Sequence, residues 1–134
     1  MPADAGQLCR QVINADDSIR YVALVNKMGK IAASELRQGL SPILTEQERE
    51  SYAMKAVLGK MGKEDFAYKL GPLLFTTAVF KKVKRVEVPL GGDEKGGDGW
   101  GMLIVSFDFQ SDHEQIILKK VLPLIKQNLA QIDI

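Results

Sequence analysis

The hydrophobic residues of this chain recur with two different periods, and the changes of period predict the order of its helices and strands. Near the N-terminus, apolar residues at helical spacing predict a short amphipathic helix: Leu8, Val12 and Ile13. The apolar runs Ile19–Val25 and Ile31–Ser34 follow, and the polar tip between them contains Gly29, which suits the positive φ of a tight turn. We therefore expect a β-hairpin after the first helix.

A capping box marks the start of the middle helix. The Thr45 side chain can accept a hydrogen bond from the backbone N–H of Glu48, whose own side chain reaches back to Thr45. We expect this helix to extend at least to Lys60, to be interrupted at Gly62, and then to resume. The pair Gly71-Pro72 is expected to stop it, because glycine ends helices and proline cannot continue them.

The second half of the chain contains more strands and a closing helix. The segment Phe75–Leu90 is β-rich, but its alternation slips, which predicts a bulge or tight bend near Lys82–Lys84. Gly101–Phe107 is almost continuously apolar, as in a strand buried on both faces. A second capping box over Ser111–Glu114 predicts the last helix, which Pro123 is expected to kink near its middle.

These elements predict an α+β fold in the order α-β-β-α-β-β-α. We expect a mainly antiparallel sheet of four to five strands flanked by helices, with Gly101–Phe107 at its centre. The 134 residues fit a single domain covering residues 1–134.

Composition narrows the function only by exclusion. The net charge of +1 gives no overall field that attracts nucleic acid or an anionic membrane, so we expect neither as a partner. The single cysteine, Cys9, cannot form an internal disulfide, which fits a reducing compartment. The N-terminus lacks the pattern of a signal peptide, and no apolar run approaches the ~20 residues of a membrane span. We expect a cytoplasmic protein.

Residues that could carry chemistry are few and lack a supporting pattern. The close carboxylate pairs Asp16-Asp17 and Asp108/Asp112 have no EF-hand spacing, so we interpret them as turn residues. His113, the only histidine, would need a nucleophile such as Cys9 or Ser106, but no nucleophile elbow surrounds either residue. We expect no catalytic site, no metal and no cofactor.

The glycine-rich segment 91–101 resembles a phosphate-binding loop only in composition. A phosphate loop joins a strand to a helix N-terminus, whereas this segment joins two strands and carries acidic residues. We interpret it as a flexible connection.

The middle helix has more apolar surface than one contact requires. At about 100° per residue its apolar side chains cover an arc of roughly 200°, but packing on a sheet needs a stripe only a little over ~100° wide. Another helix of the same chain could cover the excess; we favour a second copy of the chain. The candidate interface residues are Ala53, Met54, Val57, Leu58 and Met61.

A run of four cations within five residues forms a candidate basic patch: Lys81, Lys82, Lys84 and Arg85. Such a run can contact phosphates or an acidic partner. It can also belong to an exposed edge strand whose lysines discourage the addition of another strand. We favour the edge strand.

The element order and the hairpin Tyr21–Ser34, an apolar strand followed by a polar tip with glycine and then Ile-Ala-Ala-Ser, resemble the roadblock/LC7 family and its profilin-like and longin relatives. The chain is also similar to small uncharacterised archaeal proteins. The roadblock resemblance implies a non-catalytic dimer that regulates or scaffolds a small Ras-like GTPase or a motor assembly. It further implies a dimer seam over residues 45–61 and 75–90. The segment Lys63–Leu70 and the long last helix depart from the family pattern.

A small-ligand sensor of PAS- or GAF-like architecture is the alternative function. It would need a pocket between the sheet and the middle helices, lined by aromatic residues: Tyr52, Phe66, Tyr68 and Trp100. Aromatic side chains also fill ordinary cores, and we favour that interpretation.

Overall fold

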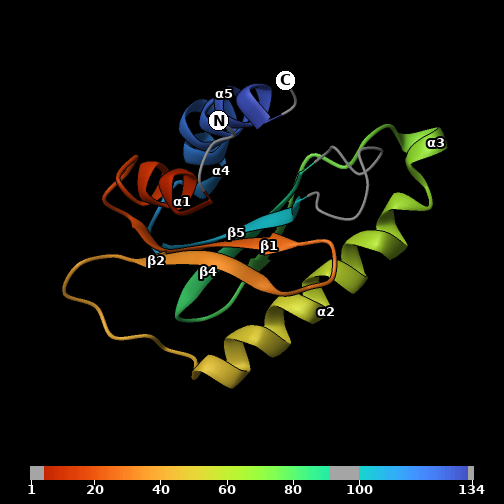
Figure 1. Cartoon of the computed structure of the whole chain (residues 1–134). Coiled ribbons are helices and arrows are strands. Elements are labelled where there is room, and N and C mark those ends of the chain that lie inside the picture. Colours follow the sequence, from red (N-terminus) through yellow and green to blue (C-terminus); the bar gives the residue numbers. More distant parts are fainter. Residues whose placement is uncertain (1–4, 91–99, 133–134) are drawn as a thin grey trace.

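Five antiparallel strands form one sheet in the order β2-β1-β5-β4-β3 (Figure 1). The structure is a computed structural model that describes residues 5–90 and 100–132. The strands are β1 (Ile19–Asn26), β2 (Ile31–Leu36), β3 (Thr76–Val79), β4 (Val83–Pro89) and β5 (Trp100–Asp108). The helices are α1 (Ala5–Ile13), α2 (Glu46–Glu64), α3 (Ala67–Leu70), α4 (His113–Ile116), the π-helical η2 (Ile117–Val121) and α5 (Leu122–Ile132). The expected α+β fold with an antiparallel sheet is confirmed.

The central strand and the hairpin follow the sequence pattern closely. In β5, residues 101–107 are all buried, because β1 and β4 flank the strand and helices cover both of its faces. The hairpin joins β1 to β2 through a turn in which Gly29 has a φ of 85°. Both predictions are confirmed.

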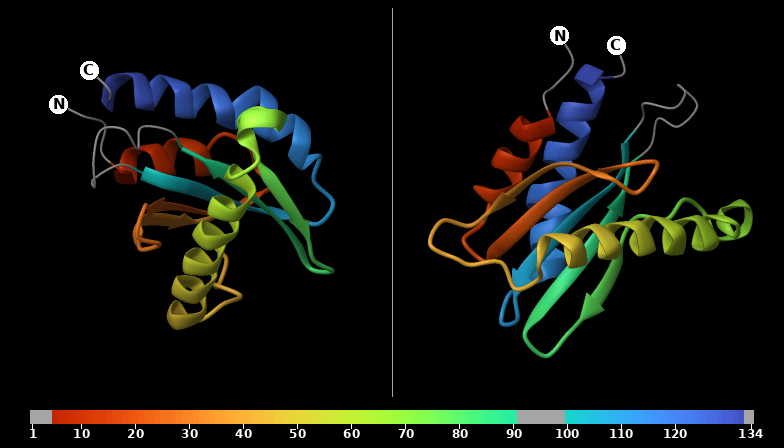
Figure 2. Two further views of the ribbon diagram at one scale, coloured as in Figure 1. Left: turned by 90° about the vertical axis from the view of Figure 1, so that its right-hand side faces the viewer. Right: turned by 60° about the horizontal axis from the view of Figure 1, so that its bottom comes forward.

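Helices lie on both faces of the sheet but cover them unequally (Figure 2). On one face α1, α4, η2 and α5 enclose the larger core, in which Val12, Phe107 and Val121 are fully buried. On the other face α2 crosses the strands by itself. It packs on a smaller cluster from β1 and β5 that includes Ala23, Val25 and Met102.

The middle helix breaks later than expected. The capping box of Thr45 and Glu48 is present, but α2 continues through Gly62 to Glu64. A glycine inside a helix costs about 1 kcal/mol and does not by itself end the helix, so this prediction was wrong. The break lies instead at Phe66, whose backbone (φ −105°, ψ 6°) leaves the helical region before α3 begins. Gly71, with a φ of 89°, ends α3 as expected.

The slip of alternation in the segment 75–90 is a hairpin turn. The segment divides into β3 and β4, and the N–H of Phe80 donates to the carbonyl of Val83 at 2.9 Å. The expected tight bend is therefore present just before the predicted position. It leaves β3 at the edge of the sheet.

The closing helix has one unexpected and one expected feature. Ser111 does not cap it: its N–H donates to the carbonyl of Asp108 in the turn after β5, and the N-cap is Asp112 without a side-chain hydrogen bond. The predicted second capping box was wrong. Where a kink was predicted near Lys119–Leu122, the helix has a π-helical turn, η2, which ends two residues before Pro123, whose nitrogen cannot donate a backbone hydrogen bond.

The predicted glycine-rich connection falls mainly on residues 91–99, which lie outside the described residues. Within the described ranges, none of the helices has both the length and the apolar character that crossing a membrane requires.

Candidate interaction surface

Most of the surface of α2 is not covered by its own chain. Of its 19 residues only three are buried, namely Ala53, Ala56 and Val57. They pack on the cluster from β1 and β5, so the helix touches the sheet through a narrow strip. Apart from the half-buried Arg49, Tyr52 and Lys60, the rest of the helix is exposed and available to another molecule.

The candidate interface residues on α2 divide into two groups. Ala53 and Val57 are part of the chain's own core and are not available to a partner. Met54, Leu58 and Met61 are 38%, 58% and 55% exposed and follow one another at i, i+4 and i+7. We call these three residues the apolar stripe.

The apolar stripe lies on the flank of α2 that faces the β1–β2 turn. A Cβ atom added to Gly29 would come within 2.8 Å of the Met54 sulfur, so the stripe begins beside this turn. Met61 lines a hollow together with Lys27 and Trp100. The stripe is therefore directed away from the edge strand β3.

The opposite flank of α2 faces β4 and β3 and contains the exposed Gly59, whereas Gly62, four residues after Leu58, lies on the outer face of the helix. A Cβ added to Gly59 would meet only the Lys63 Nζ, at 3.9 Å, and one added to Gly62 would meet nothing within 4 Å. Among the residues that the structure describes, no packing contact requires glycine at either position. On the sheet side of this flank lies Tyr52.

The edge strand β3 presents unpaired backbone groups to the outside. Phe80 and Val83 form a hydrogen-bonded pair, and the register pairs Thr77 with Val86 and Val79 with Lys84. Hydrogen-bonded and non-hydrogen-bonded pairs alternate in an antiparallel ladder. The N–H groups of Thr77 and Val79 therefore point away from β4.

The basic run does not form one patch, and it does not lie on an edge strand. Lys81 and Lys82 are exposed in the turn between β3 and β4. Lys84 and Arg85 belong to β4, which is paired on both sides, and they alternate to opposite faces of the sheet. Lys84 donates to the carbonyl of Ser111 at 2.9 Å. The prediction of an edge strand protected by these cations was therefore wrong.

Arg85 forms a half-buried cluster with two tyrosines under α2. Its guanidinium carbon lies 4.5 Å from the ring centre of Tyr52 and 5.8 Å from that of Tyr21, both within cation–π range. Burial lowers the pKa of Arg85 and raises the pKa values of Tyr52 and of the neighbouring Glu87. In the described part of the chain no carboxylate forms an ion pair with Arg85.

A groove of about 320 Å³ opens beside this cluster, between the segment before α2 and the β3–β4 turn. We call it the α2 groove. Its apolar lining is Ile43, Leu44, Tyr52, Phe80 and Val83, and its cationic lining is Lys81, Lys82 and Arg85.

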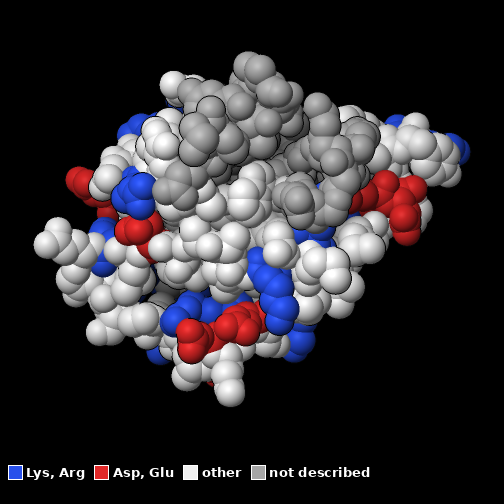
Figure 3. Space-filling model, viewed as in Figure 1, with Lys and Arg blue, Asp and Glu red and all other residues white. Residues whose placement is uncertain are grey.

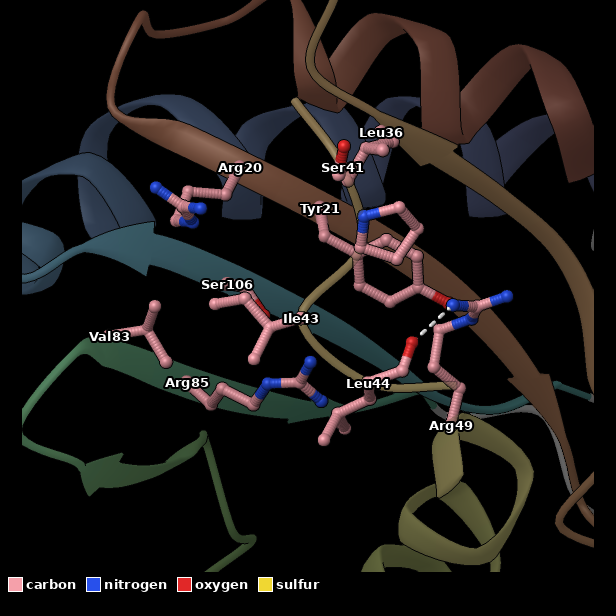
Figure 4. A pocket seen from close by; sticks show the side chains of 11 residues that line it. Arg20, Tyr21, Leu36, Ser41, Ile43, Leu44, Arg49, Val83, Arg85 and Ser106 are labelled. Atoms are coloured by element: carbon pink, nitrogen blue, oxygen red, sulfur yellow. Dashed lines mark hydrogen bonds between the residues drawn. The ribbon is translucent and has the colours of Figure 1, made fainter. Parts of the chain in front are cut away.

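A much smaller cavity of about 30 Å³ adjoins the groove, and Figure 4 shows its lining. Arg49 closes it by donating to the carbonyl of Leu44 at 2.7 Å. The buried hydroxyl of Ser106 lacks a hydrogen-bond partner within the described residues. The cavity has room for about one water molecule and not for an organic ligand.

The four aromatic residues considered for a sensor pocket do not come together. Tyr52 lines the α2 groove, whereas Trp100 lines the separate hollow beside Met61. Phe66 and Tyr68 are 59% and 81% exposed. The aromatic pocket of a ligand sensor is therefore not formed by these residues.

The residues considered for catalysis also lie apart. Cys9 lies on α1 and is buried in the core on one face of the sheet, whereas Ser106 faces the small cavity on the other face. His113 lies beside the ring of Phe107, at 6.3 Å between centroids. Among the residues that the structure describes, no group of three or more histidine, cysteine or acidic side chains is arranged to hold a metal ion.

Two of the four carboxylates considered for cation binding, Asp16 and Asp108, are engaged in ion pairs. Asp16 accepts from the N–H and hydroxyl of Ser18 and from Lys120, and these hydrogen bonds lower its pKa to about 2. Asp108 accepts from Arg37 and Arg20, which lower its pKa. On the face shown in Figure 3, side chains of both charges are interspersed and form no single basic surface.

Comparison with known proteins identifies the fold. No protein-family model matches the sequence, and no curated protein matches it. A roadblock/LC7 domain from Streptomyces avermitilis superposes with a TM-score of 0.73 at 11% identity, over 98% of this chain and 100% of that one. The chain has the roadblock/LC7 fold.

Two other structures with this fold are similar to the chain. MglB from Myxococcus xanthus superposes with a TM-score of 0.69 at 15% identity, over 96% of this chain and 93% of that one. The gliding protein MglB from Thermus thermophilus superposes with a TM-score of 0.65 at 11% identity, over 92% of this chain and 89% of that one. The resemblance drawn from the hairpin and the element order is confirmed at the level of the fold.

Sequence reasoning located α2 but missed the α2 groove within this roadblock/LC7 fold. The groove combines Ile43, Tyr52 and Phe80, which come from three separate segments. Gly59 carried a signal that was not used, since an exposed glycine inside a long helix is costly unless something requires its small size.

Proposed function

We propose that the protein is a non-catalytic interaction module that forms a homodimer through β3 and the adjacent flank of α2, and that the dimer binds a small Ras-like GTPase. The similarity in fold to roadblock/LC7 domains supports this proposal. So does the position of Ser106, which faces the small cavity on the side of the sheet opposite to Cys9.

The main structural support for the proposed dimer is the unprotected edge of β3. Its sequence, Thr-Thr-Ala-Val, has no charge, no proline and two outward amides, at Thr77 and Val79. Natural proteins normally protect an exposed edge strand with lysine, proline, a bulge or a covering element. An edge with none of the first three beside a largely uncovered helix is well suited to pairing with the same edge of a second copy.

The flank of α2 beside β3 supports the same seam. Glycine inside a helix costs about 1 kcal/mol relative to alanine, and among the described residues no packing contact on this flank requires glycine at position 59. Two helices related by a two-fold axis can approach closely where their facing positions lack side chains. In addition, a structure of MglB, which shares this fold, is described as having a tetrameric arrangement.

The apolar stripe is the surface that we assign to the GTPase. Met54, Leu58 and Met61 face away from β3, so a seam along β3 leaves them accessible. Flexible methionine side chains adapt to partner surfaces. The small GTPase itself is proposed from the roadblock resemblance.

Light scattering during size-exclusion chromatography tests the dimer. We expect twice the chain mass of 14.8 kDa at micromolar concentration. Thr77→Pro removes an outward N–H without breaking a hydrogen bond to β4, so it should give a folded monomer. Thr77→Val keeps the N–H and the branched shape, and should remain dimeric. A wild-type monomer at several hundred micromolar would refute the dimer.

Binding to purified small GTPases from the source cell, loaded with GDP or a GTP analogue, tests the second part. Leu58→Glu should weaken binding at least tenfold while the dimer persists. Leu118→Glu makes the same substitution at a leucine that is 43% exposed on the helices covering the opposite face of the sheet, and this variant should bind the GTPase normally. If no GTPase binds in either nucleotide state, the partner assignment is wrong and the dimer is unaffected.

A further inference from the structure

The segment after α2 projects from the body of the molecule with apolar side chains uncovered. It comprises residues 65–70, which we call the arm, and it includes α3. Phe66, Tyr68 and Leu70 are 59%, 81% and 84% exposed. Figure 2 shows that α2 carries the arm beyond the sheet on the side of β3. Three large apolar side chains exposed on one short projecting segment indicate a contact site for another protein surface.

The arm cannot fill the α2 groove of its own chain. The groove lies at the start of α2, beside Ile43 and Leu44, and the arm lies at its other end. The helix has 19 residues, which at 1.5 Å each separates the two by about 28 Å. Each chain therefore has an open apolar groove and an exposed apolar arm that cannot contact each other.

Pairing of two β3 strands brings the arm of one chain to the groove of the other. The arm precedes β3 in the chain, and Phe80, which lines the groove, follows it. When the strand pairs antiparallel with its own copy, the beginning of each strand lies beside the end of the other. Arm and groove also lie on the same side of the sheet, the side that α2 crosses.

We propose that the arm of each protomer occupies the α2 groove of the other, so that each groove is completed by a second copy of the chain. This inference rests on the proposed dimer through β3 and deepens it. The exchange is reciprocal, as a two-fold interface requires, and it occurs twice in each dimer.

The chemistry of the two surfaces is complementary. Phe66 and Tyr68 are of a size to enter an opening with walls of Ile43, Leu44 and Phe80. The groove also contains three cations, Lys81, Lys82 and Arg85, and no anion lines it. The arm supplies the carboxylate of Asp65, whereas Glu64 in the turn before it is paired with Lys60 of its own chain at 3.3 Å. A carboxylate from the second copy would add to the attraction between Arg85 and the neighbouring Glu87 of its own chain.

Cross-linking between two singly substituted proteins tests the contact directly. Phe66→Cys and Phe80→Cys are each prepared, mixed, and treated with a short bifunctional maleimide. The native Cys9 is fully buried and should not react in the folded protein. We expect a covalent dimer that contains one chain of each kind. A mixture of Phe66→Cys with Leu118→Cys should give none, because position 118 lies on the opposite face of the sheet.

Dimer dissociation constants provide the quantitative test. Phe66→Ser and Phe80→Ser should each raise the dissociation constant at least tenfold, because each removes an apolar contact twice per dimer. The double variant should raise it by less than the product of the single effects, since the two residues share one contact.

The outcomes separate this inference from the proposed dimer. A wild-type monomer refutes both. A stable dimer that forms no cross-link and tolerates Phe66→Ser refutes the exchange and leaves the β3 seam intact. If Phe80→Ser weakens binding of the GTPase but not the dimer, the groove has another occupant and the exchange is refuted.

Discussion

Replacing Gly59 by leucine should change the stability of the monomer and of the dimer in opposite directions. In the single chain, the added Cβ meets only the end of a lysine side chain, the Lys63 Nζ at 3.9 Å. Leucine is favoured over glycine inside a helix by about 0.7 kcal/mol. For a chain of this length that gain should raise the melting temperature of the monomer by about 2–3 °C.

In the dimer the same substitution inserts two leucines where two helices are proposed to approach. Forcing extra methylene groups into a packed contact typically costs about 1–3 kcal/mol. The dissociation constant should therefore rise by about 5- to 150-fold. Gly59→Ala provides a graded comparison, because it gives the full helix preference with a much smaller side chain.

Thermal melting over a concentration series separates the two effects. Below the dissociation constant, Gly59→Leu should melt above the wild type, and well above that concentration it should melt below it. Sedimentation equilibrium measures the dissociation constants independently. If Gly59→Leu raises the melting temperature equally at every concentration, this flank of α2 is not in the interface.

Three further predictions concern the single chain. Asp16→Asn should lower the free energy of unfolding by about 1 kcal/mol at pH 7, after allowance for solvent screening of the pair with Lys120. Because the pKa of Asp16 is lowered from 3.8 to about 2, the stabilisation by its carboxylate is complete above pH 4 and is lost towards pH 2. Urea titrations of the wild type and the variant should therefore give the same stability near pH 2. Thr45→Ala removes the acceptor for the Glu48 N–H and should cost about 1 kcal/mol in the same titration, whereas an unchanged value would show that the cap does not stabilise α2. Phe107→Ala, at a fully buried position, should cost about 3–5 kcal/mol, and a loss below 1 kcal/mol would contradict the core described above.

The elements that could be predicted from the sequence are those fixed by local chemistry. Gly29 has the positive φ that its turn requires, and the capping box at Thr45 involves residues only three positions apart. Residues 101–107 had to be buried on both faces because they offer no polar alternation. In each case the deciding interaction lies within a few residues or follows from a simple period.

The features that could not be predicted depend on competition between local signals and distant packing. Ser111 has the spacing of a cap, but the turn after β5 engages its N–H first. Gly62 carries a signal for a helix break, but the hydrogen bonds of α2 continue through it. The apolar arc of α2 is wider than its contact with the sheet, as the sequence indicated, because part of it is exposed. The sequence did not reveal that Ala53 and Val57 face the sheet whereas the apolar stripe remains exposed.

The two edges of the sheet differ in a way that explains why association is assigned to β3. The β2 edge carries Glu35 within the strand and Arg37 directly after it, and α1 packs alongside β2. A charged edge with a neighbouring helix resists the addition of another strand. The β3 edge has neither charge nor proline, because the nearby cations fall in the turn and on β4. Charge therefore protects one edge and leaves the other open beside an uncovered helix, so two copies have a single favourable way to extend the sheet.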